Sequence, residues 1–173
     1  MKKFTVFTPT YNRMDMLPKL YESLLKQTDG DFVWLLVDDG STDRTEALIQ
    51  GYILEKRIEI QYLKQNNQGK HIAINTALEK IRTPYFITID SDDYITENCI
   101  EVWQSVSLQI DEKEEYAGFS FIRFSEDTDY QPENYGKRTW TVHNSYQWEY
   151  AGEMVFCFKT EKVKQFKFPV FKN

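Results

Sequence analysis

Three aspartates follow a short apolar run in the segment YFITIDSDDYI, residues 85–95. Asp90, Asp92 and Asp93 repel one another unless one of them is protonated or a cation lies among them. The three residues are therefore a candidate metal site, whereas an acidic turn without an ion is the plainer alternative. An EF-hand loop does not fit, because its sixth position counted from Asp90 is Ile95, where glycine is required.

Three other polar segments also follow short apolar runs, so they occupy the same position after a predicted strand as the aspartate segment does. In an open α/β sheet, ligands bind outside the carboxyl ends of the parallel strands. We therefore expect all these segments to face one crevice. They are TPTYNR (8–13), DDGSTD (38–43), NNQGKH (66–71) and DSDD (90–93).

The elements that must position these segments alternate regularly over the first 110 residues. Each apolar run is typical of a strand, and a stretch with helical periodicity follows it; the leucines near residues 17–25 are one example. Four such repeats at a spacing of about 25–30 residues predict a doubly wound α/β layer with a mostly parallel sheet. We expect Pro18 in the first turn of its helix and a capping box between Asp43 and Glu46. The expected strands are 3–8, 32–38, 58–63 and 85–90.

The pattern changes after Lys113, where we expect a mixed C-terminal part. Residues 116–124 resemble a further strand, and 153–166 resemble a strand followed by a short helix. The polar, aromatic-rich stretch between them is typical of a surface loop that binds a ligand. The final segment FKFPVFKN follows directly, so we expect the chain to be cut short at its C-terminus.

Composition narrows the class of protein. The 173 residues carry a net charge of −6 without any block of Lys or Arg, so duplex nucleic acid is not an expected partner. No apolar run has membrane-spanning length, and the N-terminal apolar stretch is too short for a signal peptide. Cys99 and Cys157 lack metal or redox spacing and suit a reducing compartment. We expect a cytoplasmic protein, with peripheral contact at the inner face of the membrane compatible with this.

Common nucleotide motifs are missing. The sequence contains neither a Walker loop nor G-x-G-x-x-G, which argues against ordinary ATPases and dinucleotide enzymes. Gly69 and Lys70 at a helix start would favour an anion, because backbone N–H groups and the helix dipole add to the lysine charge. A plain helix start is the alternative reading of the same residues.

Four motifs follow one another along the chain: TVFTPTYNR, LLVDDGSTDRT, NQGKHIAIN and YFITIDSDD. In this order and spacing they resemble the inverting nucleotide-sugar glycosyltransferases of family 2, of bacterial type and with the GT-A fold. The resemblance covers about residues 3–110 and is specific for the family, but much less specific for the sugar. It implies a single domain over 1–173, in which 1–113 binds nucleotide-sugar and metal and 114–173 begins the acceptor half.

The resemblance also implies roles for individual residues. Tyr11 would lie against the base, Asp39 would accept a hydrogen bond from the base imide, and Asp90 would reach the ribose. Asp92, with Asp93 beside it, would hold Mn²⁺ or Mg²⁺ on the diphosphate. The donor-binding set implied in this way is Thr8, Pro9, Tyr11, Arg13, Asp38, Asp39, Lys70, Asp90 and Ser91.

The expected reaction moves a sugar from a nucleotide-sugar, with a UDP-sugar preferred, to a glycan or lipid-linked acceptor. An inverting transfer needs a carboxylate base for the acceptor hydroxyl. Glu153 and Glu149 are the late acids that could serve, whereas the family resemblance puts the base beyond Asn173. Two alternatives stay open: a catalytically incomplete nucleotide-binding domain, and a sugar-phosphate nucleotidyltransferase. The latter usually has a Gly-rich loop after its first strand, which TPTYNR is not.

Overall fold

The computed structural model describes residues 1–122 and 154–169 of the chain. Its contacts divide the chain into two units, one of residues 1–119 with 156–173 and one of residues 120–155. All the polar strand-end segments predicted above belong to the first unit. The elements are β1 (Phe4–Thr10), α1 (Leu17–Leu25), β2 (Phe32–Asp38), α2 (Thr45–Glu55), β3 (Ile60–Lys64), α3 (Lys70–Lys80), β4 (Tyr85–Thr88), α4 (Cys99–Ser107), β5 (Gly118–Ile122), β6 (Met154–Lys159) and α6 (Thr160–Val163).

The strands form a six-stranded mixed sheet with the order β3-β2-β1-β4-β6-β5. β1 pairs in parallel with β2 on one side and with β4 on the other, and β2 pairs in parallel with β3. β6 is antiparallel to β4, with Tyr85 opposite Lys159. The predicted α/β class with a mostly parallel sheet is confirmed.

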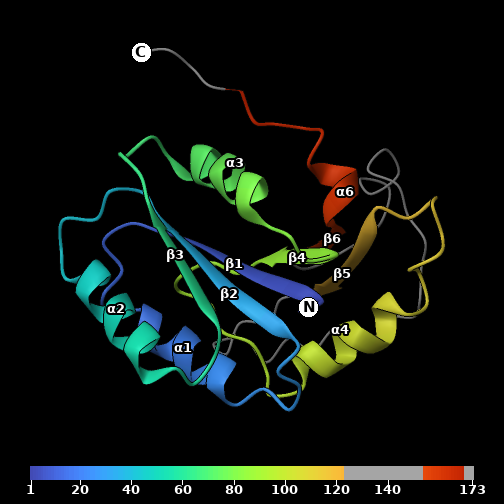
Figure 1. The fold of residues 1–173 in the computed structure, drawn as a ribbon, viewed down its shortest axis with the longest axis horizontal. Helices are drawn as coiled ribbons and strands as arrows, with labels where there is room; N and C mark the ends of the chain where they lie inside the picture. The colour runs from blue at the N-terminus through green and yellow to red at the C-terminus, as the bar shows by residue number, and fades with distance from the viewer. Residues whose placement is uncertain (123–153, 170–173) are drawn as a thin grey trace. The chain divides into compact units, whose positions relative to one another are not determined.

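Helices cover both faces of the parallel part of the sheet (Figure 1). Phe7, Leu35 and Val37 pack with Ala77 and Leu78 of α3 on one face. On the other face, rings from α1 and α2 stack around the β2 indole, and α4 adds a further aromatic contact. β1 and β2 are buried along their whole length, which explains why β2 is continuously apolar up to Asp38 and why β1 contains no charged residue.

Pro9 lies inside β1, a strand with two neighbours. The pairing with β4 covers only Phe4–Phe7, so at Pro9 only β2 runs alongside. The missing N–H of proline therefore interrupts no ladder bond on the β4 side. β1 extends to Thr10, two residues beyond the predicted end, and delivers the following loop directly to the sheet edge.

The first turn of α2 differs from the prediction. α2 begins after Arg44 without a side-chain cap, and the Glu46 carboxylate accepts a hydrogen bond from Lys64 Nζ at 2.7 Å. The predicted capping box is therefore wrong in its Glu46 half, whereas the Asp43 carboxylate does accept the N–H of Thr45, the first residue of α2, at 2.9 Å. The end of β3 brings a cation beside the helix, and this tertiary partner replaces the local one. Pro18 lies in the first turn of α1, as predicted.

Across the described ranges 1–122 and 154–169, no helix combines the length and the apolar character needed to cross a lipid bilayer.

Candidate functional site

The loops that follow β1, β2 and β4 leave the same edge of the sheet, because these strands are parallel and adjacent. Hydrogen bonds already join them at the strand ends. The Asp39 N–H donates to the Thr10 carbonyl at 2.8 Å, and the Ile89 N–H donates to the Phe7 carbonyl at 2.9 Å. The predicted convergence of these segments is thus a property of the fold.

Asp38 ends β2 and is fully buried. One carboxylate oxygen accepts the Ser41 N–H at 2.7 Å, and the other accepts the Tyr62 hydroxyl at 2.7 Å. Burial, together with this hydrogen bond to Asp38, raises the pKa of the Tyr62 phenol well above its ordinary value. Asp38 therefore orders the β2–α2 loop from within, in agreement with the turn-ordering role that the resemblance implied.

Asp39 is also buried, with 5% of its surface exposed. Its Oδ1 accepts hydrogen bonds from Gln65 Nε2 at 2.7 Å and from the Gln68 N–H at 2.9 Å, and its Oδ2 accepts the Gly69 N–H at 2.7 Å. A carboxylate offers about four acceptor positions, and donors within the described part of the chain occupy three of them, which leaves one on Oδ2. Asp39 thus fixes the β3–α3 loop, a role that the sequence did not indicate.

Gly40 shows how closely the β2–α2 and β3–α3 loops approach each other. Its φ of +84° suits glycine, and a Cβ there would lie 2.9 Å from the backbone nitrogen of Asn67. The two loops border a hollow of about 600 Å³ lined by Gly40, Lys64, Gln65, Asn66 and Asn67. One of these lining residues, Gln65, donates a hydrogen bond to the Asp39 carboxylate.

Asn12 ties the β1–α1 loop to the β2–α2 loop. Its side-chain oxygen accepts the N–H groups of Thr42 at 2.8 Å and Asp43 at 3.3 Å, and its own N–H donates to Ser41 Oγ at 2.9 Å. Its φ is +52°, in the left-handed region where asparagine is enriched. Asn12 lies within the predicted segment TPTYNR, but no role was predicted for it; an asparagine in a polar loop after a strand is the signal that could have indicated one.

Asp43 continues the same connection. Although burial would raise its pKa, hydrogen bonds to the Thr45 side chain and backbone and to the Met14 N–H lower the pKa of the Asp43 carboxyl below its ordinary value. The Arg13 N–H donates to Thr45 Oγ1 at 3.1 Å. Several hydrogen bonds therefore hold the β1–α1 and β2–α2 loops together.

The four predicted donor-binding residues of the first motif differ from one another in how far they are exposed. Thr8 is fully buried, and its hydroxyl accepts the Trp34 indole N–H at 3.0 Å. Pro9 is buried within β1. Tyr11 is 46% exposed, and Arg13 is partly exposed, with its guanidinium contacting Met16 sulfur at 3.4 Å. Tyr11 is thus accessible to a ligand at the sheet edge. Thr8 is not accessible, and its side chain fixes β1 against β2 through the hydrogen bond with Trp34.

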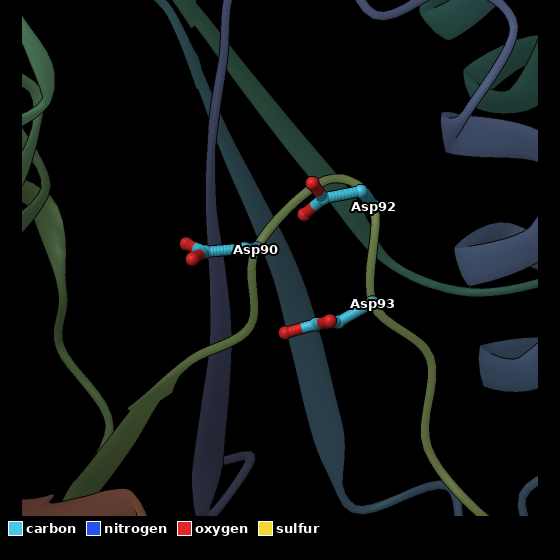
Figure 2. A group of neighbouring side chains, drawn as sticks. All are labelled: Asp90, Asp92 and Asp93. Atoms are coloured by element: carbon cyan, nitrogen blue, oxygen red, sulfur yellow. The ribbon is translucent and has the colours of Figure 1, made fainter. Parts of the chain in front are cut away.

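The aspartate turn follows β4. One carboxylate oxygen from each of Asp90, Asp92 and Asp93 lies within 4.8 Å of the others. Figure 2 shows the Asp92 and Asp93 side chains extending into the space between the two arms of the turn, and the Asp90 side chain extending outward from the first arm. Twice a metal–oxygen distance of 2.0–2.6 Å is about 4–5 Å, so one divalent ion can contact all three. The residues present therefore fit Mg²⁺ or Mn²⁺. Ser91, between them, is buried.

Lys70 joins the aspartate turn to the β3–α3 loop. Its Nζ lies 2.6 Å and 2.8 Å from the two carboxylate oxygens of Asp90. Lys70 is the first residue of α3, and the preceding Gly69 has a φ of +93° that a side chain would strain. Lys70 and Asp90, predicted separately from sequence, are thus in direct contact.

The predicted catalytic acids are not part of this geometry. Glu153, and the second late acid Glu149, lie outside the described residues. Within the described part, the acids gathered at the sheet edge are those of the β2–α2 loop and of the turn after β4.

The family model described as "Glycosyl transferase family 2" matches residues 5–168, nearly the whole chain. The chain belongs to this family. Family 2 membership also confirms the resemblance that four sequence motifs carried.

Two curated relatives illustrate the family. The poly(ribitol-phosphate) beta-N-acetylglucosaminyltransferase TarS of Staphylococcus aureus is 33% identical over 103 residues, which are 58% of this chain and 18% of TarS. The teichoic acid poly(glycerol phosphate) polymerase of Staphylococcus epidermidis is 34% identical over 101 residues, which are 58% of this chain and 14% of the polymerase. The chain spans a small part of either relative, so their names do not fix its activity or substrates.

Solved structures show the GT-A fold for this family 2 chain. Crystal structures of S. aureus TarS 1–349 with UDP and with UDP-GlcNAc superpose with TM-scores of 0.72 and 0.71 at 25% identity. Each covers 96% of this chain, and 50% and 48% of the TarS chains. The mannosyltransferase PcManGT from Pyrobaculum calidifontis, in complex with GDP-Man and Mn²⁺, has a TM-score of 0.69 at 19% identity, over 97% of this chain and 48% of its own, and shows the fold alone.

Proposed function

We propose that this protein is a metal-dependent inverting glycosyltransferase that uses a nucleotide-sugar donor, with a UDP-sugar preferred. Family membership supports sugar transfer over the nucleotidyl transfer that the sequence left open. The structures of TarS with UDP and with UDP-GlcNAc, at 25% identity, support the uridine donor.

One chain of contacts carries the proposal. Asp39 accepts the Gly69 N–H at 2.7 Å, and the next residue, Lys70, contacts Asp90 at 2.6 Å. The carboxylate assigned to the base and the carboxylates assigned to the metal are therefore joined through two consecutive residues. A nucleoside diphosphate has the same order of groups: a base at one end and a diphosphate at the other.

On the base side, we assign Tyr11 to stacking and Asp39 to the imide of uracil. The exposed Tyr11 ring offers a stacking face at the sheet edge. Asp39 has one acceptor position left on Oδ2, which suits a single N–H donor such as N3–H of uracil. In this proposal the backbone of these loops is kept in position by the remaining predicted residues of the two segments, Thr8, Pro9, Arg13 and Asp38.

On the diphosphate side, we assign Asp92 and Asp93 to the divalent ion and Asp90 to the ribose or the ion. When bound, the ion supplies Lewis-acid stabilisation to the departing diphosphate. These aspartates place negative charge where such an ion would be held, and Lys70 adds a positive charge beside the diphosphate. The ion is Mn²⁺ or Mg²⁺, since oxygen-only ligand sets suit both.

The base removes a proton from the acceptor hydroxyl as its oxygen attacks the anomeric carbon, and the nucleoside diphosphate leaves from the opposite face. Glu153 and Glu149 stay candidates for this base, together with acids beyond Asn173. For the acceptor we propose a glycan or lipid-linked saccharide. The relatives named for poly(ribitol-phosphate) and teichoic acid support an anionic cell-surface polymer or its precursor.

Calorimetry with UDP, in the presence and absence of Mn²⁺, tests the donor site first. We expect binding that depends on Mn²⁺ and a preference for UDP over CDP and GDP. Release of UDP from a panel of UDP-sugars, with and without acceptor saccharides, then tests transfer. Binding without transfer under all conditions would support the catalytically incomplete alternative, whereas no UDP binding at any Mn²⁺ concentration would falsify the proposed function.

The same transfer assay tests the base. If Glu153 is the base, Glu153→Gln lowers transfer by about 10²–10⁴-fold while UDP affinity is unchanged. Glu149→Gln is the matched variant, with the same charge change in the same part of the sequence. Full transfer by both variants would place the base elsewhere.

A further inference from the structure

Lys70 contacts the aspartate turn in an unusual way for a residue assigned to the nucleotide. Its ammonium contacts both oxygens of Asp90, at 2.6 Å and 2.8 Å. Asp90 is one of the three carboxylates whose oxygens lie within 4.8 Å of one another. The lysine therefore places a positive charge at the site where the proposed function puts a divalent ion.

An ammonium and a divalent ion compete at such a site for two reasons. Lys70 engages lone pairs of Asp90 that an ion would coordinate, and its charge repels the ion over a few ångströms. The ammonium also neutralises part of the charge of three crowded carboxylates, which lowers their mutual repulsion. Lys70 thus acts on the aspartates as a bound cation does.

The contact is also able to open. The side chains of Lys70 and Asp90 are 54% and 38% exposed, and an exposed ion pair contributes little to stability. Lys70 has a flexible stem and begins α3, an eleven-residue helix whose first N–H groups and dipole favour an anion nearby. A diphosphate beside this helix start would offer the ammonium a second partner.

We infer that Lys70 is an internal counter-ion of the aspartate turn. When metal and nucleotide bind together, the Lys70 ammonium moves from the Asp90 carboxylate to the donor diphosphate. This inference rests on the proposed function and concerns how metal binding and nucleotide binding affect each other at the same site. Without nucleotide, Lys70 weakens metal binding; with nucleotide, it strengthens binding of the metal–nucleotide pair. Metal and nucleotide therefore bind with positive coupling, and the coupling acts equally on both ligands.

Lys70→Met tests the inference, because methionine keeps much of the stem and removes the charge. Binding of Mn²⁺ alone, followed by the electron paramagnetic resonance signal of the free ion, should tighten about two- to fivefold, the size of an exposed ion pair. UDP affinity at saturating Mn²⁺, measured by calorimetry, should fall instead. Changes of opposite sign distinguish a counter-ion from a residue that only supports the fold, whose loss would weaken both.

Two variants serve as controls. Lys64→Met removes another lysine at the same sheet edge, paired with Glu46 rather than with the turn, and should leave Mn²⁺ affinity unchanged. Lys70→Arg keeps the charge and should keep weak binding of Mn²⁺ alone. Thermal melting of each variant checks that the fold is retained.

The outcomes separate the inference from the function on which it rests. Unchanged or weaker binding of Mn²⁺ alone by Lys70→Met, with Mn²⁺-dependent UDP binding intact in the unmodified protein, overturns the counter-ion role alone. Absence of Mn²⁺-dependent UDP binding in the unmodified protein overturns the proposed function and the inference together.

Discussion

The two sides of the candidate site differ in how far the protein's own hydrogen bonds satisfy their carboxylates. On the base side, Asp38 and Asp39 are buried, and together their oxygens accept five hydrogen bonds, from the β2–α2 loop, from β3 and from the β3–α3 loop. On the metal side, Asp92 is exposed, and Asp90 contacts an exposed lysine. The same residue type thus forms part of the scaffold in one loop and faces solvent in the other.

The difference follows from what satisfies each carboxylate. A buried carboxylate is stable only if hydrogen bonds replace its lost water, so Asp38 and Asp39 commit their oxygens to loops of the fold. Carboxylates that must hold an ion keep their oxygens accessible and accept mutual repulsion. We expect substitutions on the base side to lower stability and substitutions on the metal side to lower ligand affinity.

The largest expected effect is on ligand affinity at the metal side. Asp92→Ala should weaken UDP binding in Mn²⁺ by more than about tenfold, because a ligand of the ion is lost. The melting temperature should stay the same or rise slightly, since one of several like charges is removed. Calorimetry and thermal melting measure the two properties. Glu112→Ala, the same charge change on an exposed residue after α4, is the control, and unchanged UDP affinity in Asp92→Ala would refute the metal role.

On the base side, Asp39→Ala should reverse that pattern. Three donors of the β3–α3 loop lose their acceptor, and a lost buried partner costs about 1–3 kcal/mol of unfolding free energy. Urea unfolding measures this loss. Asp43→Ala, an exposed aspartate that also accepts loop N–H groups, is the matched control and should cost less.

The same variant also sharpens the base assignment. If Asp39 accepts N3–H of uracil, the unmodified protein should prefer UDP to CDP, and Asp39→Ala should bind both with similar affinity. Competition calorimetry in Mn²⁺ measures the preference. Equal affinity for both nucleotides in the unmodified protein would remove the base-binding role and leave Asp39 with its structural role.

The smallest expected effect concerns support of the base side from β3. Tyr62→Phe removes the hydroxyl that donates to fully buried Asp38, and should lower the free energy of unfolding by about 1 kcal/mol. Mn²⁺ affinity should not change, because two strands, β2 and β1, separate β3 from β4 in the sheet. Urea unfolding and Mn²⁺ titration together measure this separation; a loss of Mn²⁺ affinity would show that the two sides are not independent.

Much of this arrangement could be predicted from the sequence. Continuous apolar runs predicted the buried strands, and their polar ends predicted the loops at one sheet edge, because parallel strands with helical crossovers leave their carboxyl ends together. The cluster of Asp90, Asp92 and Asp93 followed from their closeness in sequence alone. The contact of Lys70 with Asp90 did not, since twenty residues separate them.

Tertiary structure decided what each polar side chain contacts. Glu46 binds Lys64 rather than capping its own helix, because the end of β3 lies beside α2. Asn12 ties two loops whose approach depends on the parallel pairing of β1 and β2. Asp39 fixes a loop about 30 residues further along the chain.

The sequence by itself determined the elements, their order and the edge at which polar groups collect, because periodicity and local spacing act over a few residues. Only the tertiary structure decided that Asp38 and Asp39 are buried in loop contacts while the turn after β4 keeps accessible oxygens. The physical reason is desolvation. Whether a carboxylate loses its water depends on which distant segments cover it, and that information is not contained in the residues on either side of it.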